Sequence, residues 1–157
     1  MKPAVFLAGA ALIFAVLLGA AFIWDCGRAL QSAFDRVEDV DREVKINEER
    51  VMNAIPGLGV KSTELDNVVK WYRETKSPEE RHRAYDAVLA RVADAKPEAA
   101  DPTDPIRRRA ADEYAGAQNR RLIALRHYQE KVASYNEVAR GVSGRIGIKL
   151  TGLPASL

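Results

Sequence analysis

The chain has 157 residues, of which 29% are charged and 47% are hydrophobic, and its formal net charge is +2. These values are those of an ordinary folded protein and exclude a largely disordered or collagen-like chain. A single cysteine excludes an internal disulfide and a zinc site built from several cysteines. Residues 25–104 carry a net charge of −5 and residues 105–157 one of +6. We interpret this asymmetry as complementary faces of one bundle; attraction of the last helix to an anionic surface is the alternative.

The first apolar run, residues 3–24, contains no charged side chain. As a helix its 22 residues rise about 33 Å, which is enough to cross a hydrocarbon core of about 30 Å. A cleaved signal peptide is the alternative, because Gly19 and Ala21 are small residues at the spacing of a cleavage site. The run is longer than the apolar part of a signal peptide, so we expect residues 1–25 to be a retained transmembrane anchor.

Two features of this anchor bear on its assembly and orientation. A stripe of small residues, Ala11, Ala15 and Gly19, is compatible with self-association. Lys2 precedes the run and favours a cytoplasmic amino terminus, which places the following domain on the extracytoplasmic side. We therefore expect a single-pass protein of the bacterial inner membrane that contacts membrane lipid through residues 3–24.

Between residue 29 and about residue 55, apolar side chains recur at alternating steps of four and three. This spacing predicts an amphipathic helix that continues from the anchor. Asp41 and Glu48 interrupt the apolar stripe, and Pro56–Gly59 break or sharply kink the helix because proline lacks an amide donor and glycine adds flexibility. A set of carboxylates is expected on a solvated face of this helix: Glu38, Asp39, Asp41 and Glu43.

Capping signals predict two shorter helices. Ser62 or Thr63 caps the first of them. The second begins with Ser77 as cap, Pro78 in the first helical position and Glu80 completing a capping box, and it stops before Pro97. The positions expected to face a core are Leu65, Val68, Val69 and Tyr72 in one helix and Tyr85, Val88, Leu89 and Val92 in the other.

The remaining chain contains a linker, a long helix and a short final segment. Residues 97–104 form the linker, and Asp104 caps a last helix that runs from Pro105 to about Arg140. Residues 26–140 thus form the helical domain. Residues 141–157 are apolar and basic but too rich in glycine for a stable helix; we favour packing along the bundle, with a lipid surface as the alternative. The stripe of the long helix, interrupted by Arg121, is Tyr114, Leu125, Tyr128, Val132, Tyr135 and Ala139.

The expected fold is therefore all-α, with a single transmembrane helix followed by an antiparallel bundle of about four helices with a long final helix. This layout resembles the LemA family of bacterial membrane proteins, which have a short anchor, a helix ending at an Ile-Pro step and a long final helix. Ala54–Gly59 is similar to the family's L-I-P-N-L-V segment, and Gln118–Asn136 shares the spacing of its E-N-R-I-A-x-A-R-x-x-Y-N-x-x-V-x-x-Y-N motif. The resemblance implies an envelope-associated helical bundle, and it supplies no active residues.

Sequence motifs of common enzyme classes are missing from the chain. It contains no P-loop, no Gly-x-Ser-x-Gly and no dinucleotide-binding fingerprint. His82 and His127 lie on different predicted helices with no second histidine one turn away, so we expect surface positions rather than metal ligation. We therefore predict a protein that is not an enzyme and that needs no cofactor or metal.

Protein–protein contact is then the predicted mode of action. We expect a membrane-anchored scaffold or adaptor that binds another envelope protein, with a mechanical tether such as a phage spanin-like subunit as the alternative. Nucleic acid is not expected, because the arginine clusters lack interleaved aromatic residues. The candidate partner-binding residues are basic positions of the last helix that an acidic partner reaches easily: Arg107, Arg108, Arg109 and Arg120.

Overall fold

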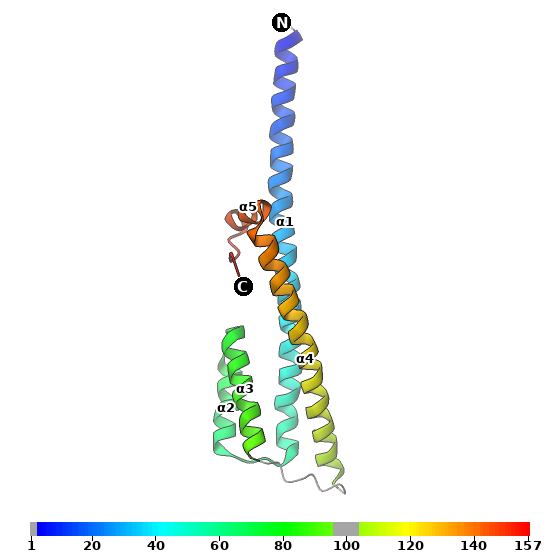
Figure 1. The fold of residues 1–157 in the computed structure, drawn as a ribbon, viewed down its shortest axis with the longest axis vertical. Helices are drawn as coiled ribbons and strands as arrows, with labels where there is room; N and C mark the ends of the chain where they lie inside the picture. Colours follow the sequence, from blue (N-terminus) through cyan, green and yellow to red (C-terminus); the bar gives the residue numbers. More distant parts are fainter. Residues whose placement is uncertain (1–2, 96–103) are drawn as a thin grey trace. The chain divides into compact units, whose positions relative to one another are not determined.

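The computed structural model describes residues 3–95 and 104–157, with side chains from residue 12 onward. Figure 1 shows its helices, and no strand occurs among these residues, which confirms the all-α fold class. The helices are α1 (Pro3–Ala54), α2 (Thr63–Glu74), α3 (Pro78–Asp94), α4 (Pro105–Arg140) and α5 (Val142–Thr151), with a 3-10 turn at Ile55–Leu58. Most of the linker predicted at 97–104 lies outside the described residues.

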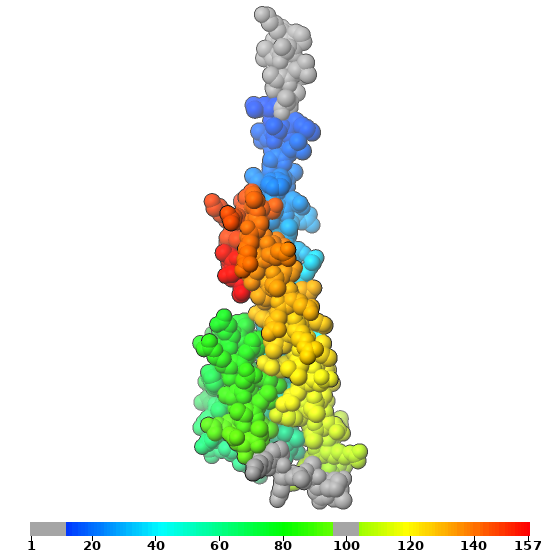
Figure 2. Space-filling model, viewed as in Figure 1, coloured from blue at the N-terminus to red at the C-terminus, as the bar shows by residue number. Residues whose placement is uncertain are grey.

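The helix α1 continues from the apolar run into the amphipathic segment without a break, as predicted. Residues 12–24 of α1 expose most of their large apolar side chains, including Leu12, Phe14 and Trp24 at 70%, 64% and 71%. In the view of Figure 2 no other segment covers this part of α1. The described part of the chain thus contains one helix long and apolar enough to cross a membrane, near the amino terminus.

The expected helix boundaries follow from local chemistry. α1 gives way to the 3-10 turn at Ile55, directly before Pro56, and Gly59 then adopts a left-handed conformation with φ of 75°. Such a conformation is accessible to glycine at little cost. Asp104 caps α4 by accepting from the backbone amides of Ile106 (2.9 Å) and Arg107 (3.3 Å). These bonds satisfy amides that have no partner inside the helix.

The two predicted serine caps have different outcomes. The Ser62 hydroxyl accepts from the Leu65 amide at 3.5 Å, so the cap of α2 is confirmed. The capping box predicted for α3 is wrong, because the Ser77 side chain makes no capping hydrogen bond. The first turn of α3 is closed instead by the Arg81 amide, which donates to the Ser77 carbonyl oxygen at 2.9 Å. Pro78, which needs no amide partner, occupies the first helical position as predicted.

The chain divides into two compact units, and both long helices contribute to each. The first, called the terminal unit here, consists of residues up to 39 together with 128–157. The second, the central unit, consists of residues 40–127. The expected helical domain, residues 26–140, therefore supplies residues to both units.

The central unit has a core drawn from the end of α1, from α2 and α3, and from the first part of α4. α2 and α3 pack against each other as a hairpin, since only three residues separate them. Tyr72 and Tyr85 meet edge to face with ring centroids 6.4 Å apart. The other buried members of this core are Val51, Met52, Ile55, Leu65, Ala84, Val88, Val92 and Ala117.

The terminal unit has a smaller core formed by α1, the end of α4 and α5. Its buried members are Leu30, Val37, Tyr135 and Ala139. Phe34 meets the Tyr135 ring edge to face at 5.9 Å, and the Tyr135 hydroxyl donates to the Pro154 carbonyl oxygen. Ile148 and Leu153 pack against this cluster, so the final segment packs on the unit as favoured.

The prediction that residues 141–157 contain no stable helix is wrong, because Val142–Thr151 forms α5. Glycine inside a helix costs about 1 kcal/mol relative to alanine, and here close packing offsets this cost. A Cβ atom at Gly144 would lie 2.0 Å from the Val138 carbonyl oxygen. A Cβ atom at Gly147 would lie 2.9 Å from the Cys26 carbonyl oxygen. The glycines therefore let α5 approach its neighbours rather than prevent the helix.

Candidate functional site

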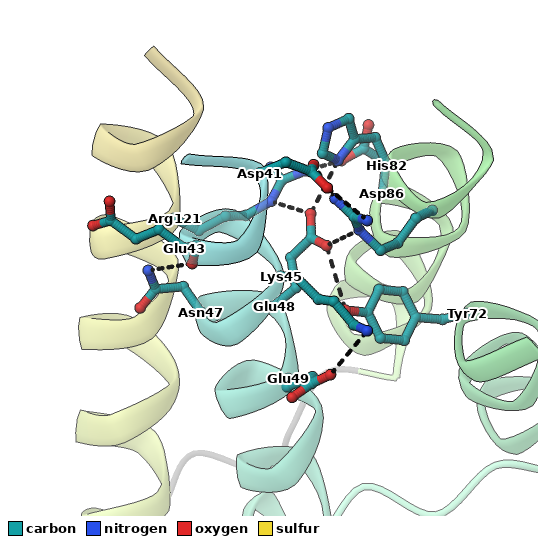
Figure 3. Close-up of polar contacts among 11 residues, drawn as sticks. Asp41, Glu43, Lys45, Asn47, Glu48, Glu49, Tyr72, His82, Asp86 and Arg121 are labelled. Atoms are coloured by element: carbon teal, nitrogen blue, oxygen red, sulfur yellow. Dashed lines mark hydrogen bonds and ion pairs between the residues drawn. The ribbon is translucent and has the colours of Figure 1, made fainter. Parts of the chain in front are cut away.

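The most unusual group of the central unit is Glu48, a carboxylate on α1 with no exposed surface. Burial of an unpaired charge is very costly, so such a group requires donors at close range. Figure 3 shows that side chains from α2, α3 and α4 converge on it. We call this group the Glu48 cluster, and its members are Asp41, Glu48, Tyr72, Arg81, His82 and Arg121.

Each oxygen of the Glu48 carboxylate has two partners. Oε1 accepts from Arg121 Nε at 3.0 Å and lies 3.1 Å from Nδ1 of His82. Oε2 accepts from Arg81 Nε at 3.1 Å and from the Tyr72 hydroxyl at 3.3 Å. Because these partners come from three different helices, one carboxylate ties all four helices of the central unit together.

The two arginines of the cluster have further partners. Arg81 pairs with both oxygens of Asp41, at 3.3 Å through Nη1 and more closely through Nη2. The Arg121 guanidinium lies over the Tyr85 ring, 4.0 Å from its centroid, and its Nη2 is 3.8 Å from the exposed carboxylate of Asp86. Both arginine side chains are only 7% exposed. Stacking on an aromatic face and bidentate pairing are the two geometries that suit a buried guanidinium.

The electrostatics of the cluster favour the charged forms of Glu48 and Arg81. Burial raises the pKa of Glu48, but the hydrogen bonds from His82 and Arg121 outweigh it, so the pKa lies below its ordinary value. For Arg81, burial lowers the pKa, and pairing with Asp41 and Glu48 more than reverses this, so its pKa is raised. Burial and the nearby Glu48 charge raise the pKa of Tyr72. Glu48 is thus an ionised acceptor, and Tyr72 remains a neutral donor.

This arrangement supports a structural role for Glu48 rather than acid–base chemistry. A general base needs an oxygen directed at a substrate, and both oxygens of Glu48 are directed at protein donors. A cavity of about 260 Å³ borders the cluster beside Tyr72 and Arg81, and Glu48 is not part of its lining. Among the described residues no group of three or more His, Cys, Asp or Glu side chains is placed to hold a metal ion.

Three members of the cluster correct the sequence expectations. Asp41 was predicted on a solvated face, but it pairs with Arg81 and its side chain is 22% exposed. His82 was predicted at the surface, but its side chain is 21% exposed and contacts Glu48. Arg121 was taken as an interruption of the apolar stripe, whereas it is a buried partner of Glu48. The physical reason is polar pairing, because the buried Glu48 carboxylate binds His82 and Arg121, whereas Asp41 is held by Arg81.

The four predicted partner-binding residues do not share one side of α4. Consecutive helical residues are about 100° apart, so Arg107, Arg108 and Arg109 point in different directions. Arg107 is half-buried and pairs with Asp104 at 3.5 Å. Arg120 is exposed and pairs with Glu113 at 3.0 Å, and Arg108 and Arg109 are exposed. Arg109 and Arg120 lie about 20° apart around the helix axis, so these two share one side of α4.

Comparison with family models, curated proteins and solved structures found no match.

Proposed function

We propose that the protein is a membrane-anchored, LemA-like scaffold or adaptor of the bacterial cell envelope whose helical bundle binds another envelope protein. One observation carries this proposal: residues 12–24 expose most of their apolar side chains on the same helix that enters both packed units. A helix of a water-soluble protein buries such side chains in the protein core, whereas a transmembrane helix exposes them to lipid. Any partner contact is thereby confined to the vicinity of the membrane, which raises its effective concentration.

The proposed topology is an anchor in the inner membrane with the helical units on the extracytoplasmic side. A fusion of alkaline phosphatase after Leu157 tests the orientation. Activity is expected, because this enzyme matures only outside the cytoplasm. An inactive but stably produced fusion would reverse the topology. The intact mass of the protein extracted from membranes tests the anchor itself, and a mature species beginning near Phe22 would show a cleaved signal peptide instead.

The adaptor role is tested by reversing the charges of Arg107, Arg108, Arg109 and Arg120 to glutamate in the full-length protein. Crosslinking in native membranes is expected to lose specific partners, with helicity and melting unchanged. A matched control reverses four exposed basic side chains elsewhere: Arg36, Arg73, Lys76 and Arg83. The proposal fails for this surface if both variants retain the wild-type set of partners, or if both lose the same ones.

A mechanical tether is the second candidate, and the length of α1 favours it. Its 52 residues form one helix that rises about 78 Å. The hairpin of α2 and α3 favours the adaptor, because a tether is better served by chain segments that stay extended. Shortening α1 by whole turns distinguishes the two functions, since only a tether depends on span. Removing residues Arg28–Asp41 is unsuitable for this test, because it deletes Leu30 from the core of the terminal unit and Asp41 from the Glu48 cluster.

A further inference from the structure

The helix α5 is seated on α1 directly after the apolar run. Gly147 lies against the Cys26 carbonyl oxygen and the Leu30 side chain, and Gly27 faces Thr151. Cys26 follows Trp24 by two residues, which is about 3 Å along the helix axis. α5 therefore lies at the level where α1 leaves its apolar segment, as can be followed in Figure 1. If residues 3–24 cross a membrane, α5 lies at the interface between lipid and water.

The outward face of α5 is amphipathic. Val142 and Leu150 are 76% and 54% exposed, and together with Ile146 they recur every four residues along one stripe. Arg145 and Lys149 are exposed and form a second, basic stripe beside it. An apolar stripe next to a basic one is the pattern of helices that lie in the headgroup layer of a membrane.

A cavity joins this face to α1. It has a volume of about 550 Å³, and its lining includes Ile23, Trp24, Arg28 and Leu150. The lining is almost entirely apolar, and the cavity is open to the surroundings of the apolar run. An acyl chain fits such a lining, and a tryptophan beside it is typical of the membrane interface.

The charged side chains of α5 and of the adjacent part of α1 favour an anionic ligand. Arg28 is part of the lining, Arg145 and Lys149 are exposed on the outward side of α5, and residues 141–157 contain no acidic side chain. Asp25 is the neighbouring acidic group on α1. The local excess of positive charge favours an anionic headgroup over a zwitterionic one, by up to about fivefold for each basic residue near the surface.

We propose that α5 and the end of the apolar run of α1 form a binding site for an anionic phospholipid. The acyl chain contacts Ile23, Trp24 and Leu150, and the phosphate faces the basic residues Arg145 and Lys149. This inference rests on the proposed membrane attachment and adds to it a second, charge-selective contact. The final segment then acts as an interfacial support that fixes the terminal unit at the membrane surface.

The test uses the full-length protein in vesicles of phosphatidylcholine and in vesicles of equimolar phosphatidylcholine and phosphatidylglycerol. An environment-sensitive fluorophore is attached through Val142→Cys in a Cys26→Ala background. Spin-labelled acyl chains in the same vesicles quench the fluorophore if α5 enters the lipid layer. We expect stronger quenching and a bluer emission with phosphatidylglycerol, and loss of this difference in Arg145→Gln/Lys149→Gln, corresponding to a drop of up to about 25-fold in lipid preference.

A control variant removes two exposed basic residues of α4, through Arg126→Gln/Lys131→Gln, and is expected to keep the preference. Fluorophore signals equal in both vesicles, or unchanged by Arg145→Gln/Lys149→Gln, would overturn the proposal. A signal that depends on dilution of the protein rather than on lipid charge would identify a second copy as the occupant and would also overturn it.

Failure of the proposed function has a different signature. In a Trp71→Phe background Trp24 is the single tryptophan, and spin-labelled lipid quenches it if the apolar run is inserted. Protein that does not float with vesicles, with Trp24 unquenched, would refute the anchor and the lipid site together. Protein that floats with vesicles and has a quenched Trp24, but whose fluorophore at position 142 gives the same signal in both kinds of vesicle, would refute the lipid site alone.

Discussion

The two units hold their helices together through different interactions, buried ion pairs in the central unit and apolar contacts in the terminal unit. The central unit buries charge at its centre, where Glu48, Arg81 and Arg121 are each less than 10% exposed. The terminal unit buries only apolar side chains and Tyr135. All the buried polar and charged residues of the described chain lie in the central unit, and Asn47 completes this set.

This difference in buried residues implies that the two units fix the register of their helices in different ways. Apolar contacts are tolerant of small shifts, whereas a carboxylate with four directed partners is satisfied in one arrangement only. In the terminal unit, register is set by shape, because Gly144 and Gly147 allow backbone contact that larger residues would block. We infer that the central unit depends on complete pairing and the terminal unit on close fit.

The largest expected effect comes from breaking the pairing. Glu48→Ala leaves Arg81 and Arg121 buried without their shared carboxylate, and we expect a loss of about 4 kcal/mol in the free energy of unfolding of the central unit. Denaturant unfolding of the full chain in detergent, followed by Trp71 fluorescence in a Trp24→Phe background, measures it. Trp71 lies on α2 and therefore reports on this unit.

Glu49→Ala is the matched control for this change. Glu49 is the next residue on α1, is exposed, and pairs only loosely with Lys45 at 3.9 Å. Exposed ion pairs contribute little, so its removal is expected to change stability by about 0.5 kcal/mol or less. Similar losses in both variants would show that the buried charges do not hold the central unit together.

The next largest effect concerns the apolar core of the terminal unit. Tyr135→Ala creates a cavity among Leu30, Phe34 and Ala139, and we expect a cost of about 3 kcal/mol. Hydrogen exchange of the peptides covering α5 and the end of α4 measures it, with the peptides of the central unit as internal reference. Tyr135→Phe keeps the ring and loses only the bond to the Pro154 carbonyl, so about 1 kcal/mol is expected. Equal protection in wild type and Tyr135→Ala would place Tyr135 outside any core.

A smaller effect is expected from disturbing close fit without creating a cavity. Gly147→Ala places a Cβ atom 2.9 Å from the Cys26 carbonyl oxygen, so α5 must shift, at a cost of about 2 kcal/mol. Gly27→Ala is the control, because its nearest neighbour would be Thr151 at an ordinary 3.9 Å. A gain of up to about 1 kcal/mol from helix propensity is expected there. Exchange protection of α5 that is unaffected by Gly147→Ala would contradict the close contact.

The sequence predicted the helices well because their signals are local. The bounds of α4 were predicted at Pro105 and Arg140, since an aspartate cap, a proline and a following glycine mark them within a few residues. α5 was missed because its glycines are destabilising in isolation, and their benefit comes from Cys26 and Val138, which a local pattern does not reveal.

The sequence contains a signal for part of the Glu48 cluster. Asp41 and Glu48 continue the alternating steps of four and three that place Val37, Val44 and Val51 in the core. A charge at a core position must find a partner, and Arg121 occupies the corresponding place in the stripe of α4. The opposite signs predict pairing between the helices. The contributions of Tyr72 and His82 depend on the fold of the α2–α3 hairpin and had no such signal.

The smallest expected effect comes from a change of pH alone, which alters the charge of Glu48. The pKa of Glu48 is lower in the folded protein than in the unfolded chain, so its ionised form stabilises the central unit at pH values above the unfolded pKa of about 4.3. This stabilisation is lost as the pH falls through the folded pKa. We therefore expect Trp71 to report progressively weaker resistance to denaturant below about pH 4. In Glu48→Gln the titrating group is gone, so the remaining stability should fall less steeply with acid. An equally steep fall would show that other carboxylates, and not Glu48, cause the acid sensitivity of the central unit.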